Sequence, residues 1–105
     1  MTDKLLVVTT TGSEEEARKI AQALVERRLA ACVNIIPRIH SVYRWEGKVE
    51  QADEWLLLIK TDRPHQEQVY TAIREVHSYS VPEFVAIAVE AGSKEYLEWM
   101  EGAIG

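Results

Sequence analysis

The sequence predicts an α+β fold, a ferredoxin-like βαββαβ sandwich with an extra C-terminal helix. Two observations lead to this prediction. Short apolar runs rich in β-branched residues are typical of buried strands, and the segments between them carry apolar residues at helical spacing. The resulting order is that of a split βαβ unit, in which two helices cover one face of a four-stranded antiparallel sheet. We expect residues 1–105 to form a single domain of this kind.

An apolar run and a capping motif mark the first strand and the first helix. Residues 5–8, Leu-Leu-Val-Val, predict a buried strand. Ser13 and Glu16 predict a capping box, because the Ser hydroxyl can accept a hydrogen bond from the amide three residues on while the Glu carboxylate returns the bond. The apolar face of the helix that follows is formed by Ala17, Ile20, Ala21 and Leu24.

The middle of the chain predicts a long strand followed by a central one. Residues 31–45 suit one long strand, interrupted by Pro37, which removes a donor from the ladder. Its large apolar side chains fall at positions of one parity, which predicts that they share a face: Val33, Ile35, Ile39, Tyr43 and Trp45. After a turn at 46–48, residues 55–59 are too continuously apolar to face water on one side, so this strand is expected to be central.

The second half of the chain predicts a helix, a strand and a final helix. Asp62 and Pro64 open the second helix, whose apolar positions are Val69, Ala72, Ile73 and Val76. Residues 84–89 predict the fourth strand. Ser93 caps the last helix, whose stripe of Tyr96, Leu97, Trp99 and Met100 is more typical of a docking face than of a ligand site.

Composition and charge exclude several classes of protein. The net charge of −5, from 12 basic against 17 acidic residues, offers no field that attracts phosphate backbones, so a nucleic-acid partner is not expected. No apolar run approaches the roughly 20 residues of a membrane span, and no signal-peptide pattern begins the sequence. We therefore expect a cytoplasmic protein without membrane insertion, and its single cysteine fits a reducing compartment.

The predicted plan leaves the second face of the sheet without helices. An apolar sheet face and a long strand interrupted by proline are not expected to stay exposed in a soluble monomer, so another chain is expected to cover them. The elements that we expect at this interface are the apolar strand that begins at Trp55 and the final helix with Trp99.

A series of segments in the middle and last thirds of the chain carries a family resemblance. The segments are Ala-Ala-Cys-Val-Asn-Ile-Ile-Pro (30–37), Ser-x-Tyr-x-Trp-x-Gly-Lys (41–48), Ile-Lys-Thr (59–61), His-x-Tyr-x-Val-Pro-Glu (77–83) and Tyr-Leu-x-Trp (96–99). In this order and spacing the chain resembles the CutA family of divalent-cation tolerance proteins. The resemblance implies a ferredoxin-like subunit in a tight homotrimer, with long second and third strands shared between neighbours, and a link to copper and other divalent metals.

The chain also departs from the family pattern. Ser78 and Ser80 stand in a segment that is usually His-Pro-Tyr-Glu or similar, which loosens a turn and removes a potential carboxylate. Thr9 and Val76 stand where some members carry a cysteine and a second histidine. A soft, cysteine- and histidine-rich Cu(I) site is therefore not expected here.

Three residues are candidate metal ligands, each with an alternative role. Cys32 could be a thiolate ligand or nucleophile, or a small buried hydrophobic residue. His77 could bind a metal or change charge near neutral pH, or it could interact with the last carbonyls of a helix. Glu83, stiffened by the preceding Pro82, could bind a cation, stay solvated or, as we favour, form an ion pair between subunits.

Four residues are candidates for a ligand cleft. Lys60 ends an apolar strand, where its ammonium group needs a partner, and Glu83 is a plausible one. Tyr43, Trp45 and Tyr79 could wall a pocket for a planar or cationic ligand, although interface packing is the commoner role of such side chains. We expect a polar cleft between subunits that brings His77, Tyr79 and Glu83 opposite Cys32 and Lys60.

These observations leave three classes of function. The first is a trimeric metal-binding or metal-responsive protein for divalent-cation tolerance, which needs no cofactor beyond a weakly bound copper or other divalent ion. The second is a small-molecule sensor or scaffold that resembles the trimeric PII-like proteins, with effector sites between subunits. The third is an enzyme such as an acylphosphatase, which is disfavoured because Gly12 leads only to acidic residues that would repel a phosphate. We therefore expect no catalytic residues and no enzymatic activity.

Overall fold

The computed structural model describes residues 2–105, and its elements follow the predicted order. The elements are β1 (Lys4–Thr11), α1 (Glu14–Glu26), β2 (Cys32–Trp45), β3 (Lys48–Asp62), a 3₁₀ turn (Arg63–His65), α2 (Gln66–Val76), β4 (Val85–Ala88) and α3 (Lys94–Ala103). The fourth strand is shorter at both ends than the sequence predicts. No helix among the described residues is both long enough and apolar enough to cross a membrane.

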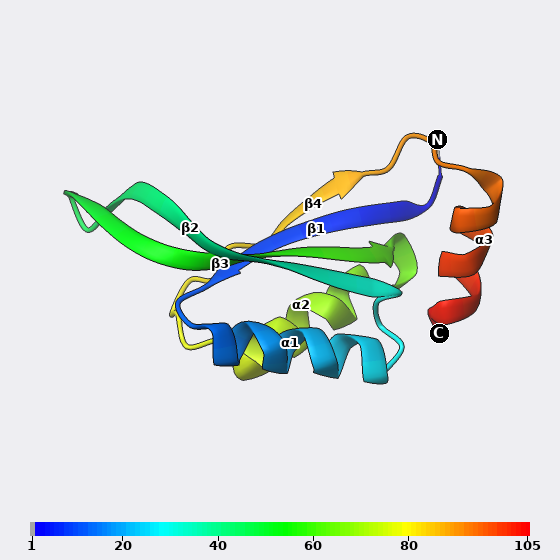
Figure 1. Cartoon of the computed structure of the whole chain (residues 1–105), viewed down its shortest axis with the longest axis horizontal. Coiled ribbons are helices and arrows are strands. Elements are labelled where there is room, and N and C mark those ends of the chain that lie inside the picture. The colour runs from blue at the N-terminus through cyan, green and yellow to red at the C-terminus, as the bar shows by residue number, and fades with distance from the viewer. Residues whose placement is uncertain (1) are drawn as a thin grey trace.

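The strands form one antiparallel sheet in the order β2-β3-β1-β4, so β3 is central, as predicted. Helices α1 and α2 lie side by side on one face of the sheet, and α3 lies across the end at which the chain begins (Figure 1). Strands β2 and β3 are much longer than β1 and β4, so their hairpin projects beyond the rest of the sheet at the opposite end (Figure 1). We call this projection, residues 39–53, the arm.

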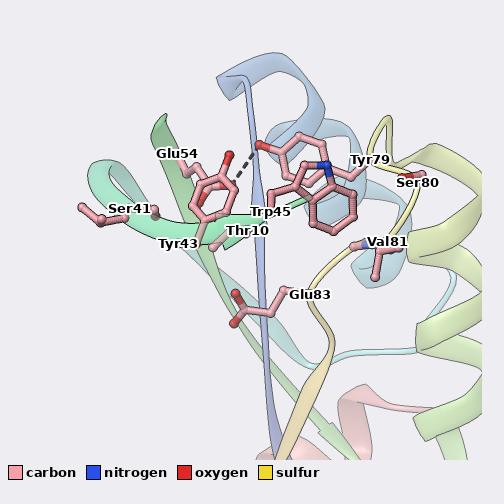
Figure 2. A pocket seen from close by; sticks show the side chains of 11 residues that line it. Thr10, Ser41, Tyr43, Trp45, Glu54, Tyr79, Ser80, Val81 and Glu83 are labelled. Carbon is pink, nitrogen blue, oxygen red and sulfur yellow. Dashed lines mark hydrogen bonds between the residues drawn. The ribbon is translucent and has the colours of Figure 1, made fainter. Parts of the chain in front are cut away.

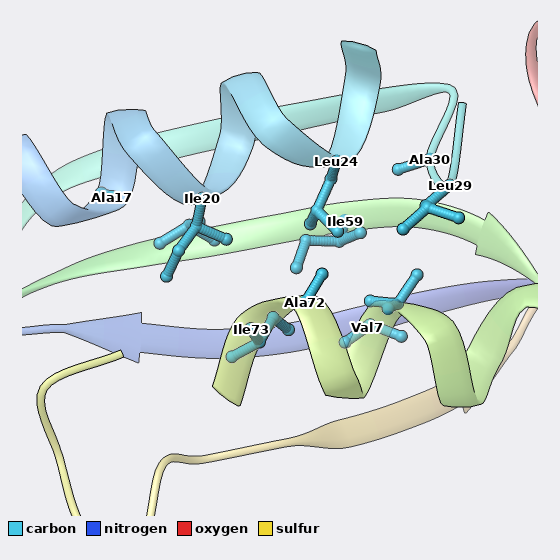
Figure 3. Packing of buried hydrophobic residues seen from close by; sticks show 11 residues of the cluster. Val7, Ala17, Ile20, Leu24, Leu29, Ala30, Ile59, Ala72 and Ile73 are labelled. Atoms are coloured by element: carbon cyan, nitrogen blue, oxygen red, sulfur yellow. The ribbon is translucent and has the colours of Figure 1, made fainter. Parts of the chain in front are cut away.

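The core lies between the sheet and the pair of helices (Figure 3). Its fully buried side chains include Val7 and Ile59 from the sheet, and they contact the predicted faces of α1 and α2. The buried helical residues are Ala17, Ile20, Leu24, Val69, Ala72 and Ile73. The helical spacing read from the sequence therefore identified the core side of both helices, because only one face of each helix can contact the sheet.

The opposite face of the sheet carries apolar side chains that neither α1 nor α2 covers. Alternation along β4 places Val85 and Ile87 on this open face, where they are 49% and 48% exposed. Ile36 of β2 is 40% exposed beside the half-buried Leu56 of β3. The predicted bare face is thus present in the subunit.

The serine caps of α1 and α3 follow the sequence, whereas Asp62 caps the 3₁₀ turn through the His65 amide and α2 itself has no side-chain cap. The Ser13 hydroxyl accepts a hydrogen bond from the Glu16 amide at 3.2 Å, and Ser93 caps α3 in the same way through the amide of Tyr96. The predicted return bond from Glu16 to Ser13 is wrong. The Glu16 carboxylate instead accepts hydrogen bonds from the amide and the hydroxyl of Ser78, because the loop after α2 runs beside the start of α1.

A β-bulge interrupts the pairing of β2 with β3. Ile36 and Ile39 lie opposite positions 56 and 54 of β3, so Pro37 and Arg38 together oppose only Trp55. Arg38 has a φ of +56°, a left-handed conformation that costs free energy for a non-glycine residue. Proline at this point needs no ladder partner, which makes it compatible with the bulge.

After the bulge, the side chains of β2 point to the opposite face of the sheet from the one that the same alternation would give without it. Val33 and Ile35 pack against the core, but the extra residue places Ile39, Tyr43 and Trp45 on the open face. The prediction that these side chains share one face is therefore wrong. A single inserted residue is enough to shift every later side chain, since the side-chain period of a strand is two.

Candidate functional site

A cavity of about 650 Å³ lies on the open face, where the arm, the end of β1 and the loop between α2 and β4 meet (Figure 2). Its lining residues are Thr10, Ser41, Val42, Tyr43, Trp45, Glu54, Tyr79, Ser80, Val81, Pro82 and Glu83. We call this cavity the arm pocket. It brings together four predicted site residues, Tyr43, Trp45, Tyr79 and Glu83.

Two features of β2 supply the aromatic side chains of the arm pocket. The bulge turns Tyr43 and Trp45 toward the open face, and the hairpin closes directly after them. Glu46 and Gly47, with φ of +51° and +78°, form the two-residue turn that matches the twist of the flanking strands. Tyr43 and Trp45 are each 43% exposed, so both rings offer surface to a ligand.

Tyr79 connects the loop after α2 to the central strand. Its hydroxyl donates a 2.9 Å hydrogen bond to Glu54, whose side chain lies inside the pocket (Figure 2). Glu54 is only 7% exposed. Burial, followed by the hydrogen bond to the Glu54 carboxylate, raises the pKa of Tyr79 far above its ordinary value, so the phenol stays a neutral donor.

Glu83 brings a second carboxylate to the arm pocket. It enters from the loop that leads into β4, and its side chain points across the pocket toward the side of Tyr43 and Glu54 (Figure 2). The residue is exposed, yet local burial and then the charge of Glu54 raise the pKa of Glu83. None of the described residues that line the pocket is a lysine or arginine, so both carboxylates lie in a site that favours cations.

His77 holds the loop against the end of β1. Its Nε2 lies 2.6 Å from the Thr10 carbonyl oxygen, and its Nδ1 lies 3.1 Å from the Tyr79 amide nitrogen. These partners define a neutral ring that donates from Nε2 and accepts at Nδ1. Both nitrogens are therefore occupied, and in this arrangement the predicted ligand His77 has no free lone pair for a metal.

Cys32 and Lys60 lie together at the far end of the open face. They pair across β2 and β3, and the Lys60 ammonium donates to the Tyr96 hydroxyl of α3 at 3.2 Å. Lys60 is six positions beyond Glu54 on β3, a separation of about 20 Å along the strand. Within one subunit, Cys32 and Lys60 therefore do not lie opposite His77, and Lys60 forms no ion pair with Glu83. The cleft was expected between subunits, so it stays a prediction.

The two predicted interface tryptophans have different surroundings. Trp55 lies on the helix side of the sheet and packs against the core cluster, since it follows Glu54 and strand neighbours alternate between faces. The Trp55 ring therefore packs inside the subunit. Trp99 is 49% exposed on α3, with its ring 5.3 Å from that of Tyr96, so it remains available for another chain.

One further group of acidic residues lies near the start of the chain. The carboxylates of Asp3, Asp62 and Glu101 bring ligand atoms within 4.8 Å of one another, and in residues 2–105 no other such group of three is found. The buried Lys4 ammonium already binds Asp3 at 2.8 Å and Glu101 at 2.6 Å. This Lys4 cluster therefore supplies its own cation, and a metal ion would have to displace it.

Sequence reasoning missed Glu54, although a signal for it is present. Glu54 directly precedes the apolar run, and alternation places it on the same face as Leu56 and Leu58. A carboxylate in an apolar row on a central strand needs a hydrogen-bond partner. That partner, Tyr79, lies 25 positions further along the chain, too far for local pattern to reveal.

Comparison with known proteins gives a consistent family. The family model described as "CutA1 divalent ion tolerance protein" matches residues 5–103. A divalent-cation tolerance protein CutA from Thermus thermophilus is 47% identical over 95% of this chain and 97% of its own length. The chloroplastic protein CutA of Arabidopsis thaliana is 42% identical over 94% of this chain, which spans 54% of that protein.

Solved structures agree with the sequence relatives. The structure of CutA from Xylella fastidiosa superposes with a TM-score of 0.96 at 39% identity, over 99% of this chain and 100% of that one. A structure titled as a periplasmic divalent cation tolerance protein CutA, from Archaeoglobus fulgidus, gives a TM-score of 0.94 at 40% identity, over 97% of this chain and 99% of that one. The family model and the full-length similarity lead to one conclusion: this chain belongs to the CutA1 family of divalent ion tolerance proteins.

Proposed function

We propose that this protein acts in divalent-cation tolerance as a metal-responsive homotrimer of ferredoxin-like subunits, and that the arm pocket is where it binds cations. The observation that carries the proposal is the pair of carboxylates, Glu54 and Glu83, that face one cavity without a lysine or arginine among its lining residues. Hard divalent cations prefer carboxylate oxygens as ligands, and copper and zinc ions accept these ligands as well.

The open sheet face supports the trimer. Val85, Ile87 and Ile36 expose apolar surface on a face that neither α1 nor α2 covers. Together with the exposed Tyr96 and Trp99 of α3, these side chains form a surface that is typical of contact with another chain. A closed ring of identical subunits would cover it without leaving an open edge.

The ligand set argues for weak binding. Two carboxylates are fewer than the three or four protein ligands of a tight zinc site, and the nitrogens of His77 are engaged elsewhere. Cys32 lies at the far end of the face, so the pocket of one subunit offers no soft ligand for Cu(I). We expect micromolar or weaker affinity, with no catalytic step and no permanently bound cofactor.

Calorimetric titration of the metal-stripped full chain with Cu(II) and Zn(II) tests this proposal. Glu83→Gln should weaken binding about tenfold or more, because a charged ligand is lost. Glu50→Gln is the matched control, since Glu50 is an exposed carboxylate on the arm that does not line the pocket. A nanomolar constant, or one that Glu83→Gln leaves unchanged, would contradict the placement of the site.

The size of the cavity favours a second candidate function, a small-molecule sensor or scaffold of the PII-like kind. At about 650 Å³ the arm pocket has the volume of an effector site rather than that of a bare ion. Its walls combine three aromatic rings with a few polar groups, which is the usual composition of a small-molecule pocket.

A cytoplasmic location stays a prediction, since the names of relatives include a chloroplastic and a periplasmic protein.

A further inference from the structure

We infer that the arm pocket takes an organic ammonium ion with an apolar body. The inference rests on the second proposed function, the effector site, and names the class of its ligand. The arm pocket combines two features that a bare metal ion does not use together. These are a wall of aromatic rings and a pair of carboxylates without a basic residue in the lining.

The aromatic wall comes from two separate parts of the chain. Tyr43 and Trp45 reach the pocket from the arm, and Tyr79 reaches it from the loop after α2 (Figure 2). The electron-rich face of such rings attracts a cation that lies within about 6 Å of the ring centre. An ammonium ion with organic substituents benefits most, because it is larger and less strongly hydrated than a metal ion.

The carboxylates select the charge of the ligand. Glu54 is 7% exposed, holds one hydrogen bond from Tyr79 and lines the cavity, so its charge lies in a poorly solvated site. Glu83 faces the same space, and the two negative charges repel each other. A cationic group between them relieves this repulsion and gives charge-assisted hydrogen bonds, whereas a phosphate or a carboxylate ligand would be repelled.

The remaining lining accounts for an apolar body. The lining also includes Val42, Val81 and Pro82, whose side chains carry no polar atom. Val81 is 67% exposed, so a ligand that covers it removes apolar surface from water. A hydrated divalent ion would leave this surface and most of the 650 Å³ unused.

Titration of the full chain with 2-phenylethylammonium and with its neutral counterpart 2-phenylethanol tests the inference. Binding is followed through amide and indole chemical shifts at neutral pH. The ammonium ion should bind at least tenfold more tightly than the alcohol, because only its charge meets the carboxylates. Glu83→Gln should weaken ammonium binding about tenfold, and Glu50→Gln should change it less than twofold, since that exposed charge is screened.

A Zn(II) titration of the same samples separates failure of the inference from failure of the proposed functions. Equal affinity for the amine and the alcohol would overturn the cationic ligand and leave an effector pocket. No saturable binding of either molecule, with Zn(II) binding that depends on Glu83, would overturn both the inference and the effector site and leave the metal site. Ammonium binding that Glu83→Gln does not weaken would overturn the assignment to the arm pocket.

Discussion

The Tyr79 hydroxyl donates a 2.9 Å hydrogen bond to the Glu54 carboxylate, and this bond joins the loop after α2 to the central strand of the sheet. It also fixes one wall of the arm pocket, since both residues line it. Removal of this bond has a predictable cost.

Tyr79→Phe should lower the free energy of unfolding by about 1–3 kcal/mol, because it leaves a buried carboxylate without its donor. Chemical denaturation measures this difference. Tyr70→Phe is the matched control, since the Tyr70 hydroxyl accepts only an exposed bond from Arg74 and should be replaced with little effect. Equal losses for the two variants would show that the bond to Glu54 carries no special weight.

His77→Ala should act on stability and not directly on metal affinity. The variant loses the bonds to the Thr10 carbonyl and to the Tyr79 amide, for an expected loss of about 1–3 kcal/mol. Thermal unfolding and Zn(II) calorimetry on the same samples separate the two effects. A large loss of Zn(II) affinity without a loss of stability would restore His77 as a ligand.

The proposed homotrimer should give a mass of three times the 12.0 kDa chain in light scattering at micromolar concentration. Ile87→Lys should dissociate it, because a charge on the open face cannot be buried against another subunit without a partner. Val25→Lys, on the outer side of α1 and 43% exposed, should leave the assembly intact. A folded monomer for the unmodified chain would contradict the oligomer.

Glu83 should make stability depend on pH in a defined direction. Its pKa is raised in the folded chain above the ordinary value of 4.5, so the folded state binds more protons than the unfolded state in the window just above that value. The contribution of Glu83 to stability is therefore complete below pH 4.5 and is lost as the pH rises through the raised pKa. The Glu83→Gln variant does not undergo this loss. The stability of the variant relative to the unmodified chain should therefore increase as the pH rises from 4.5 through the raised pKa of Glu83. A constant difference would contradict the raised pKa.

Local pattern predicted the secondary structure well because each element carries its own signal. The Ser13 cap, the core-facing residues of α1 and α2, and the central position of β3 are all confirmed. Each depends on residues within a few positions of one another. The bulge at Pro37 and Arg38 was not predicted, because its location depends on the pairing with β3 and not on β2 alone.

The site was harder to predict because its parts are distant in sequence. Tyr43, Trp45, Tyr79 and Glu83 were identified, and the structure brings them into one cavity. Glu54 was missed, and the plausible pair of Lys60 with Glu83 does not form within one subunit, because the two residues lie at different ends of the sheet. Sequence identifies which side chains have unusual chemistry, but strand register decides which of them meet.

The most direct test of the arm pocket is a titration of the ¹⁵N-labelled full chain with Zn(II), followed residue by residue. The account predicts that the largest shift changes occur at the Trp45 indole and at the amides of Glu54 and Glu83, and that Glu83→Gln moves their midpoint to about tenfold higher Zn(II) or beyond. Changes centred on the Lys4 cluster or on the exposed His40, with the arm pocket unaffected, would contradict it.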